Sequence, residues 1–131
     1  MIRPSARTIH LDTSFLIRAL DPTYAEWAKL RGWLRARRTV VMCALAWGEF
    51  LCGPIGEADE TVARRVAQRH MPVTTAEATE AARLFNHAGR RRNSFSDCII
   101  AATAILAGAE LATSNPTDFE RLLDAGLELA E

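Results

Sequence analysis

The chain has 131 residues, of which 49% are hydrophobic, 24% charged and 7% aromatic, and its 16 basic side chains balance 16 acidic ones. This length fits one domain and is too short for two independent hydrophobic cores, and the composition excludes a disordered or fibrous chain. We therefore expect a single domain over residues 1–131, and a net charge of zero argues against a nucleic-acid binder that relies on overall positive charge.

The first part of the chain alternates between β-forming and helical stretches. Residues 8–12 are rich in β-forming side chains and end in residues that favour a helix start, which predicts a strand followed by a helix at 15–20. A second helix is expected at 24–37. The continuously apolar, β-branched run 39–43 is typical of a strand covered on both faces in a parallel sheet. Residues 44–52 are predicted to form the next helix, stopped by a Gly-Pro pair.

The second part continues the alternation. It predicts an amphipathic helix at 58–69, a brief strand at 71–73, and a helix that opens with a capping box at Thr74 and ends near Gly89. An almost wholly apolar helix at 96–107 is interrupted in its first turn by one carboxylate, and such a helix should be buried.

The last predicted elements complete an α/β pattern. They are a strand at 110–113, a turn at 115–118 into a short helix that ends near Asp124, and a candidate last strand at 127–130. Strands that alternate with helices predict a mainly parallel sheet covered on both faces, with ligands bound outside the carboxyl ends of the strands.

The apolar stretches and the cysteines bear on where the protein works. No apolar stretch reaches the roughly 20 residues of a membrane-spanning helix, and residues 1–5 lead into a polar segment instead of the apolar core of a signal peptide. Cys43, Cys52 and Cys98 match neither a zinc ribbon nor a disulfide framework, so we expect buried free thiols. We therefore expect a cytoplasmic protein that does not associate with membranes.

Arginine makes up all but one of the basic residues and clusters along the chain. It forms paired hydrogen bonds to phosphate and stacks on bases, so basic patches around an acidic site are compatible with RNA contact. The alternative is that each cluster forms a solvated helix face. The clusters are Arg31, Arg35, Arg37 and Arg38; Arg64, Arg65 and Arg69; and Arg90, Arg91 and Arg92.

Three carboxylates do not fit an ordinary polar surface. Asp12 ends the first predicted strand, Glu49 lies within an apolar helix, and Asp97 opens the most apolar helix of the chain. Taken singly, Asp12 could be a helix cap and Asp97 could favour a helix start through the helix dipole. Glu49 has no capping role, since it lies in the middle of its helix. The three together therefore indicate a site.

These carboxylates predict a divalent metal site. Converging carboxylates repel one another, and a buried carboxylate is costly unless it is paired, hydrogen-bonded or protonated. Oxygen ligands suit Mg²⁺ or Mn²⁺, which keep several waters and use one or two carboxylates together with substrate phosphate. The expected chemistry is hydrolysis of phosphodiesters by a water that the carboxylate-bound metal activates.

Four blocks of the sequence resemble the PIN-domain family, and within it the VapC-type toxins. They occur in the family's order and at similar spacing over nearly the whole chain, which makes the match specific. The blocks are IHLDTSFLI at 9–17, WGEF at 47–50, DCIIAATA at 97–104 and LATSNPTDF at 111–119.

The resemblance implies a three-layer α/β/α sandwich with a Mg²⁺- or Mn²⁺-dependent endoribonuclease site. It further implies the toxin role in a type II toxin–antitoxin pair, a VapB-type antitoxin as partner, and a homodimer. It maps the catalytic metal ligands onto Asp12, Glu49 and Asp97. The polar residues that the resemblance places beside these ligands are Thr13, Ser14 and Thr113.

The chain departs from the family pattern at one position. Many relatives carry a fourth acidic residue just after the last parallel strand, where this chain has Asn115. Asn115 can still offer a carbonyl oxygen, but with less charge, so a second metal should bind more weakly. Asp118, one helical turn later, is the alternative fourth ligand, although it also fits a helix start.

We predict that RNA lies across the carboxyl ends of the strands, with Arg90, Arg91 and Arg92 contacting phosphates just before Asp97. The alternative is a non-catalytic protein of the same fold that serves as an RNA-binding or protein-interaction module. Other classes are excluded: the only lysine lies on an early helix, which argues against a receiver domain, and no glycine-rich nucleotide-binding motif is present.

Overall fold

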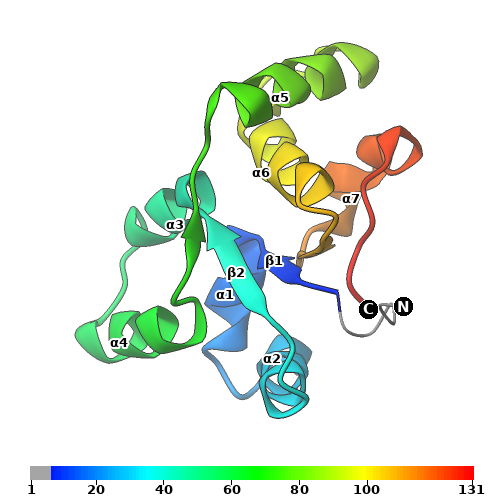
Figure 1. The fold of residues 1–131 in the computed structure, drawn as a ribbon. Coiled ribbons are helices and arrows are strands. Elements are labelled where there is room, and N and C mark those ends of the chain that lie inside the picture. The colour runs from blue at the N-terminus through cyan, green and yellow to red at the C-terminus, as the bar shows by residue number, and fades with distance from the viewer. Residues whose placement is uncertain (1–6) are drawn as a thin grey trace.

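A computed structural model describes residues 7–131; residues 1–5, where the sequence predicts no signal core, lie outside this range. Four parallel strands form one sheet in the order β3-β2-β1-β4 (Figure 1). The strands are β1 (Ile9–Leu11), β2 (Val40–Cys43), β3 (His70–Met71) and β4 (Glu110–Ala112). The predicted parallel sheet is therefore confirmed, with the first strand near its centre.

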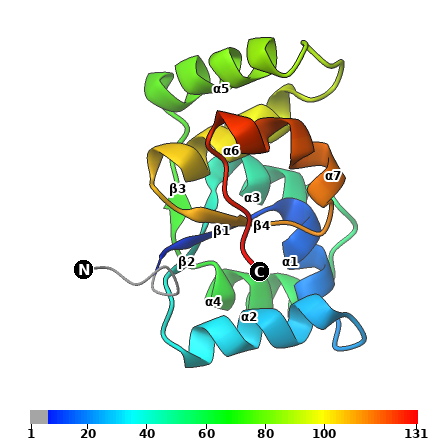
Figure 2. The same ribbon diagram turned by 90° about the vertical axis from the view of Figure 1, so that its right-hand side faces the viewer.

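The register aligns the strand ends that carry the site. Ile9 of β1 is paired with Val40 on one side and with Glu110 on the other. The backbone N–H of Asp12 donates to the carbonyl of Ala112 over 2.9 Å, so the ends of β1 and β4 are tied together. Because these strands are parallel, the segments that follow them leave the sheet at the same edge, where α1 and α7 begin in Figure 2.

Helices cover both faces of the sheet (Figures 1 and 2). On one face α1 packs against α2, with α4 beside them, and on the other face α5 packs against α6. This is the three-layer α/β/α sandwich that the sequence predicts. The helices are α1 (Thr13–Ala19), α2 (Ala25–Arg35), α3 (Ala44–Leu51), α4 (Glu57–Val66), α5 (Thr75–His87), α6 (Phe95–Leu106) and α7 (Pro116–Phe119), followed by the 3₁₀ helix η2 (Glu120–Ala125).

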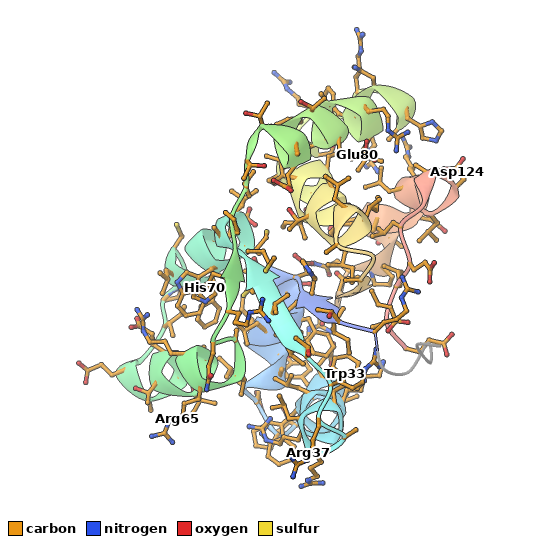
Figure 3. All side chains as sticks on the ribbon, in the orientation of Figure 1. Trp33, Arg37, Arg65, His70, Glu80 and Asp124 are labelled. Atoms are coloured by element: carbon orange, nitrogen blue, oxygen red, sulfur yellow. The ribbon has the colours of Figure 1, made fainter. Side chains whose placement is uncertain are left out.

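The core explains why the central elements are so apolar. Every residue of β1 and β2 is buried, as expected for strands with helices on both faces. Half of α6 is buried as well, and most of those residues are small, so the helix can approach the sheet closely. On the other face Trp33 of α2 stacks on Phe15 of α1 with ring centres 5.3 Å apart (Figure 3).

Several element ends differ from the sequence prediction. The helix predicted at 58–69 ends at Val66, and the strand predicted at 71–73 lies at His70–Met71. The candidate strand at 127–130 is reduced to one bridge, between Leu111 and Leu129, because the chain turns there at Gly126 with φ of 114° and meets β4 over a single residue pair.

Other predictions concern single residues. The capping box of Thr74 and Glu77 is present, as predicted. Cys43 and Cys98 are buried thiols, whereas Cys52 is exposed. Cys52 lies about 200° around the helix axis from the buried Phe50, so its side chain faces away from the core. No helix within residues 7–131 is both long and apolar enough to cross a membrane.

Candidate active site

Asp12 stands at the junction of β1 and α1 and serves first as a helix cap. Its backbone is extended, and its Oδ1 atom accepts a hydrogen bond of 2.8 Å from the backbone N–H of Thr13. The capping role that the sequence suggests is therefore real, but it occupies only one of the two carboxylate oxygens. The residue is buried, with 6% of its surface exposed, so the second oxygen also needs partners.

Two hydroxyl groups supply those partners. Ser14 Oγ and Thr113 Oγ1 each donate to Asp12 Oδ2 over 2.8 Å. Thr113 follows β4, so the bond spans the two strand ends. These bonds hold the carboxylate in one orientation. Burial nevertheless raises the pKa of Asp12, against the lowering effect of the three hydrogen bonds.

Thr13 links Asp12 to Glu49. Its hydroxyl donates to the carbonyl of Ala46 over 2.9 Å and approaches Glu49 Oε1 at 3.5 Å. Glu49 is exposed although its helix neighbours Trp47 and Phe50 are buried, so it lies at the open side of the site. Desolvation and, after it, the charge of Asp12 raise the pKa of Glu49.

Asp97 joins the same group from the first turn of α6. It is partly buried, and desolvation raises its pKa to about 6, with further contributions from the charges of Asp12, Asp118 and Glu49, in that order. A carboxylate that responds to three others lies in one electrostatic cluster with them. The structure thus brings together all three carboxylates that the sequence singles out.

Asp118 is the fourth carboxylate of the cluster. Its charge raises the pKa of both Asp12 and Asp97, and it lines a hollow together with Asp97. Asn115 has another role: it precedes α7, is exposed, and donates its backbone N–H to Thr113 Oγ1 over 3.0 Å. Between the two candidates for a fourth ligand, the electrostatic cluster contains Asp118.

The donor set of the cluster suits a hard divalent cation, since all of its side-chain donors are carboxylate oxygens. Within residues 7–131 no three His, Cys, Asp or Glu side chains are grouped closely enough to hold a metal ion. None of the four carboxylates forms an ion pair with a basic side chain in that part of the chain. Oxygen donors with uncompensated charge fit Mg²⁺ or Mn²⁺ bound through one or two carboxylates and several waters.

A basic loop lies beside the carboxylates. Arg91, Arg92 and Asn93 line a hollow with Ser94, Asp97 and Asp118. Arg90 is directed elsewhere, since its Nε donates to Asn86 Oδ1 over 2.9 Å. Of the three arginines predicted to contact RNA, the structure therefore places two at the site.

Two residues that sequence reasoning does not single out support the site. Ser114 donates its backbone N–H to Ser14 Oγ over 3.1 Å, and its hydroxyl donates to Glu26 Oε2. Glu26 also lies 3.8 Å from Arg18. The bond from Ser114 is the main reason that the pKa of Glu26 is lowered. Glu26 therefore anchors the segment that carries Thr113.

Sequence reasoning could have singled out Ser114, because it lies between the candidate residues Thr113 and Asn115. Glu26 gives no such signal, because an acidic residue in the first turn of a helix is fully explained by the helix dipole.

Histidine does not take part in this cluster. His10 lies two residues before Asp12 in the sequence, but it is 99% buried. Neither of its ring nitrogens has a hydrogen-bond partner in the described part of the chain. Burial lowers the pKa of His10 to about 4, so the ring is neutral at physiological pH. The chemistry of the site therefore belongs to carboxylates and hydroxyls.

The sequence of the chain is similar to one known protein family. The model of the PIN domain family matches residues 9–123. No curated protein is similar enough in sequence to count as a match.

Solved structures of similar fold include three toxin–antitoxin proteins. A chain of VapBC2 from Rickettsia felis, bound to a DNA fragment from the promoter, is 16% identical, with 94% of this chain and 97% of that one covered and a TM-score of 0.74. A chain of VapBC-5 from Mycobacterium tuberculosis is 25% identical, with 95% and 98% covered and a TM-score of 0.67. VapC20 from Mycobacterium tuberculosis, a toxin that cleaves the sarcin-ricin loop, is 19% identical, with 92% and 98% covered and a TM-score of 0.61.

Proposed function

This chain belongs to the PIN domain family, and on that premise we propose that it is a metal-dependent endoribonuclease, the toxin of a type II toxin–antitoxin pair. The observation that carries the proposal is the cluster of four carboxylates, Asp12, Glu49, Asp97 and Asp118, whose charges no basic side chain of residues 7–131 compensates. An unused cluster of this kind would only destabilise the fold.

Asp12 and Asp97 are the central ligands in this proposal, and Glu49 and Asp118 complete the set. A bound Mg²⁺ or Mn²⁺ would supply a water of lowered pKa and positive charge for the phosphate oxygens. The residues of the chain do the positioning. Ser14 and Thr113 hold Asp12 Oδ2, Thr13 connects α1 with α3, and Asp97 contributes fully once it is ionised.

RNA is proposed to cross the carboxyl ends of the strands, with the arginine run at 90–92 beside it. The hollow that joins Arg91 and Arg92 to Asp97 supports this placement. VapC20, whose fold is similar, is a toxin that cleaves the sarcin-ricin loop, which supports RNA as the substrate class.

A VapB-type antitoxin and a second copy of the chain are the proposed protein partners. The similar structures include VapBC complexes from several bacteria, which supports an antitoxin partner. The carboxylates of the site carry negative charge and the nearby arginines carry positive charge, so the site can attract side chains of opposite charge on such a partner. Sedimentation tests the dimer: a monomer in dilute solution would argue against self-association.

The direct test is incubation of the purified protein with a mixture of structured RNAs in the presence of Mg²⁺, Mn²⁺ or EDTA. We expect discrete cleavage products with either metal and intact RNA with EDTA. Intact RNA in all three conditions, with RNA binding retained, would instead support the non-catalytic binding module.

Glu26 provides a separate prediction about the support of the site. Replacement of Glu26 by Ala removes the acceptor for Ser114 and should loosen the segment that holds Thr113 against Asp12. Loss of such an outer partner typically costs about 10–100-fold in metal affinity or activity, and we expect about tenfold. The measurement is the metal concentration that gives half-maximal cleavage.

Glu26→Gln is the matched variant, because its amide oxygen can still accept the bond from Ser114. It should keep most of the activity lost in Glu26→Ala. Equal losses in both variants would show that the charge of Glu26, and not this hydrogen bond, matters.

A further inference from the structure

Two adjoining hollows next to the carboxylate cluster share Arg91, Ser94, Asp97 and Asp118 in their walls. The smaller one is also lined by Arg121 of η2. Basic side chains from two separate segments thus face the same space as two carboxylates. Arg121 is far from the arginine run in sequence, so only the fold brings the two together.

The guanidinium groups in this space have free donors. Within residues 7–131, Arg91 and Arg92 make no side-chain hydrogen bond and no ion pair, although Asp97 and Asp118 line the same hollow. Arg121 makes one long bond of 3.4 Å, to the carbonyl of Ala88. Each guanidinium has five N–H donors, so most of them are available to a ligand.

The loop that carries Arg91 has a defined backbone shape. Gly89, Arg90 and Asn93 have φ values of 86°, 57° and 63°, a region that side-chain-bearing residues seldom adopt. Ser94 Oγ closes the loop by donating to the carbonyl of Arg91 over 2.7 Å. The unusual backbone turns Arg90 toward Asn86 and leaves Arg91 at the hollow. Such conformations are often kept where a loop binds a ligand.

We infer that Arg91 and Arg121 form a subsite for a phosphate of the RNA backbone, beside Asp97 and Asp118; this rests on the proposed function and names the substrate contacts of the same site. Guanidinium groups bind phosphate through paired, charge-assisted hydrogen bonds. RNA repeats its phosphates along the strand, so one phosphate can occupy the arginines while its neighbour lies over the carboxylates. A single acidic side chain of a protein is a weaker candidate for this subsite. It would be repelled by Asp97 and Asp118, and it has no neighbouring phosphate to lie over the carboxylates.

The test measures binding of a fluorescein-labelled RNA of mixed sequence in EDTA, where cleavage does not interfere. Arg91→Ala and Arg121→Ala should each weaken binding about tenfold at low salt and lower the slope of log affinity against log salt by about one. Arg65→Ala is the distant control, since Arg65 extends from the outer side of α4 (Figure 3), and should change affinity less than about twofold.

Arg90→Ala is the closer comparison, because it removes the same charge one residue away from Arg91. It should lose clearly less affinity than Arg91→Ala. Arg121→Gln keeps a donor for the carbonyl of Ala88 and guards against an effect of misfolding, and it should bind RNA as weakly as Arg121→Ala. Equal effects at Arg90 and Arg91, or unchanged binding at Arg121, would overturn the subsite.

These outcomes separate the subsite from the enzymatic function. Metal-dependent cleavage by the wild type, with no contrast among the arginine variants, would leave the ribonuclease and remove the subsite. A clear contrast in binding, with no cleavage by the wild type under any metal, would leave the subsite and remove the ribonuclease.

Discussion

Replacement of Asp97 by Asn is expected to lower metal-dependent RNA cleavage by at least about 100-fold, since loss of a group that merely supports a metal ligand already costs about 10–100-fold. The amide preserves the size of the side chain and one oxygen, but it removes the negative charge. The charges of Asp12, Asp118 and Glu49 all raise the pKa of Asp97, so the amide would remove one of the four negative charges that a cation would meet in this cluster. The measurement is the initial rate of cleavage of a labelled RNA at high Mg²⁺ concentration.

Asp59→Asn is the matched control. Asp59 is exposed in the first turn of α4 and forms no ion pair with the described residues, so the same change there should leave the rate unaltered. A wild-type rate in Asp97→Asn would remove Asp97 from the catalytic centre and leave Asp12 and Glu49 to be tested in its place.

The central carboxylates could be predicted from the sequence because of a simple geometric rule. Parallel strands end at the same edge of a sheet, so residues that follow β1, β2 and β4 are brought near one another. Asp12 and Thr113 meet in this way across 101 residues of sequence. A different signal indicates Asp97, namely a lone charge at the start of the most apolar helix.

The supporting residues could not be predicted, because tertiary packing decides them. Glu26 resembles any acidic residue of a first helical turn until α2 is seen to place it against Ser114. Arg121 gains its place only when η2 folds back beside the loop before α6.

Local backbone shape decides between adjacent candidates. Arg90 and Arg91 are equivalent in sequence, and a left-handed backbone at Arg90 separates the directions of the two side chains. The choice between Asn115 and Asp118 depends in the same way on where α7 begins.

The metal-free protein should gain stability when Asp97 is replaced by Asn, the opposite direction from the effect on cleavage. The pKa of Asp97 in the folded protein is about 6, above its ordinary value of 3.8, so the folded state holds the proton more tightly than the unfolded chain does. The stabilisation of the folded state by the tighter proton binding of Asp97 is fully present below pH 3.8. It is lost as the pH rises through 6. At neutral pH the ionised carboxylate therefore destabilises the fold.

Each pKa unit corresponds to about 1.4 kcal/mol, and partial exposure of Asp97 to solvent reduces the effect, so we expect about 1–2 kcal/mol for Asp97→Asn at pH 7.5 in EDTA. This corresponds to a rise in Tm of about 3–6 °C, while Asp59→Asn should show none. At pH 4 the gain should largely vanish, because wild-type Asp97 is then protonated.

Addition of Mg²⁺ at pH 7.5 should reverse the order of stability. A ligand that binds only the folded state raises its stability in proportion to the logarithm of its concentration over Kd, and the variant should bind the ion more weakly. The wild type should therefore gain more in Tm than Asp97→Asn does. A variant that is less stable than the wild type in EDTA would show that Asp97 is a structural residue. Loss of cleavage in that variant could then result from misfolding. If the variant is stable but neither gains stability with Mg²⁺ nor cleaves RNA, the negative charge of Asp97 serves to bind the metal ion.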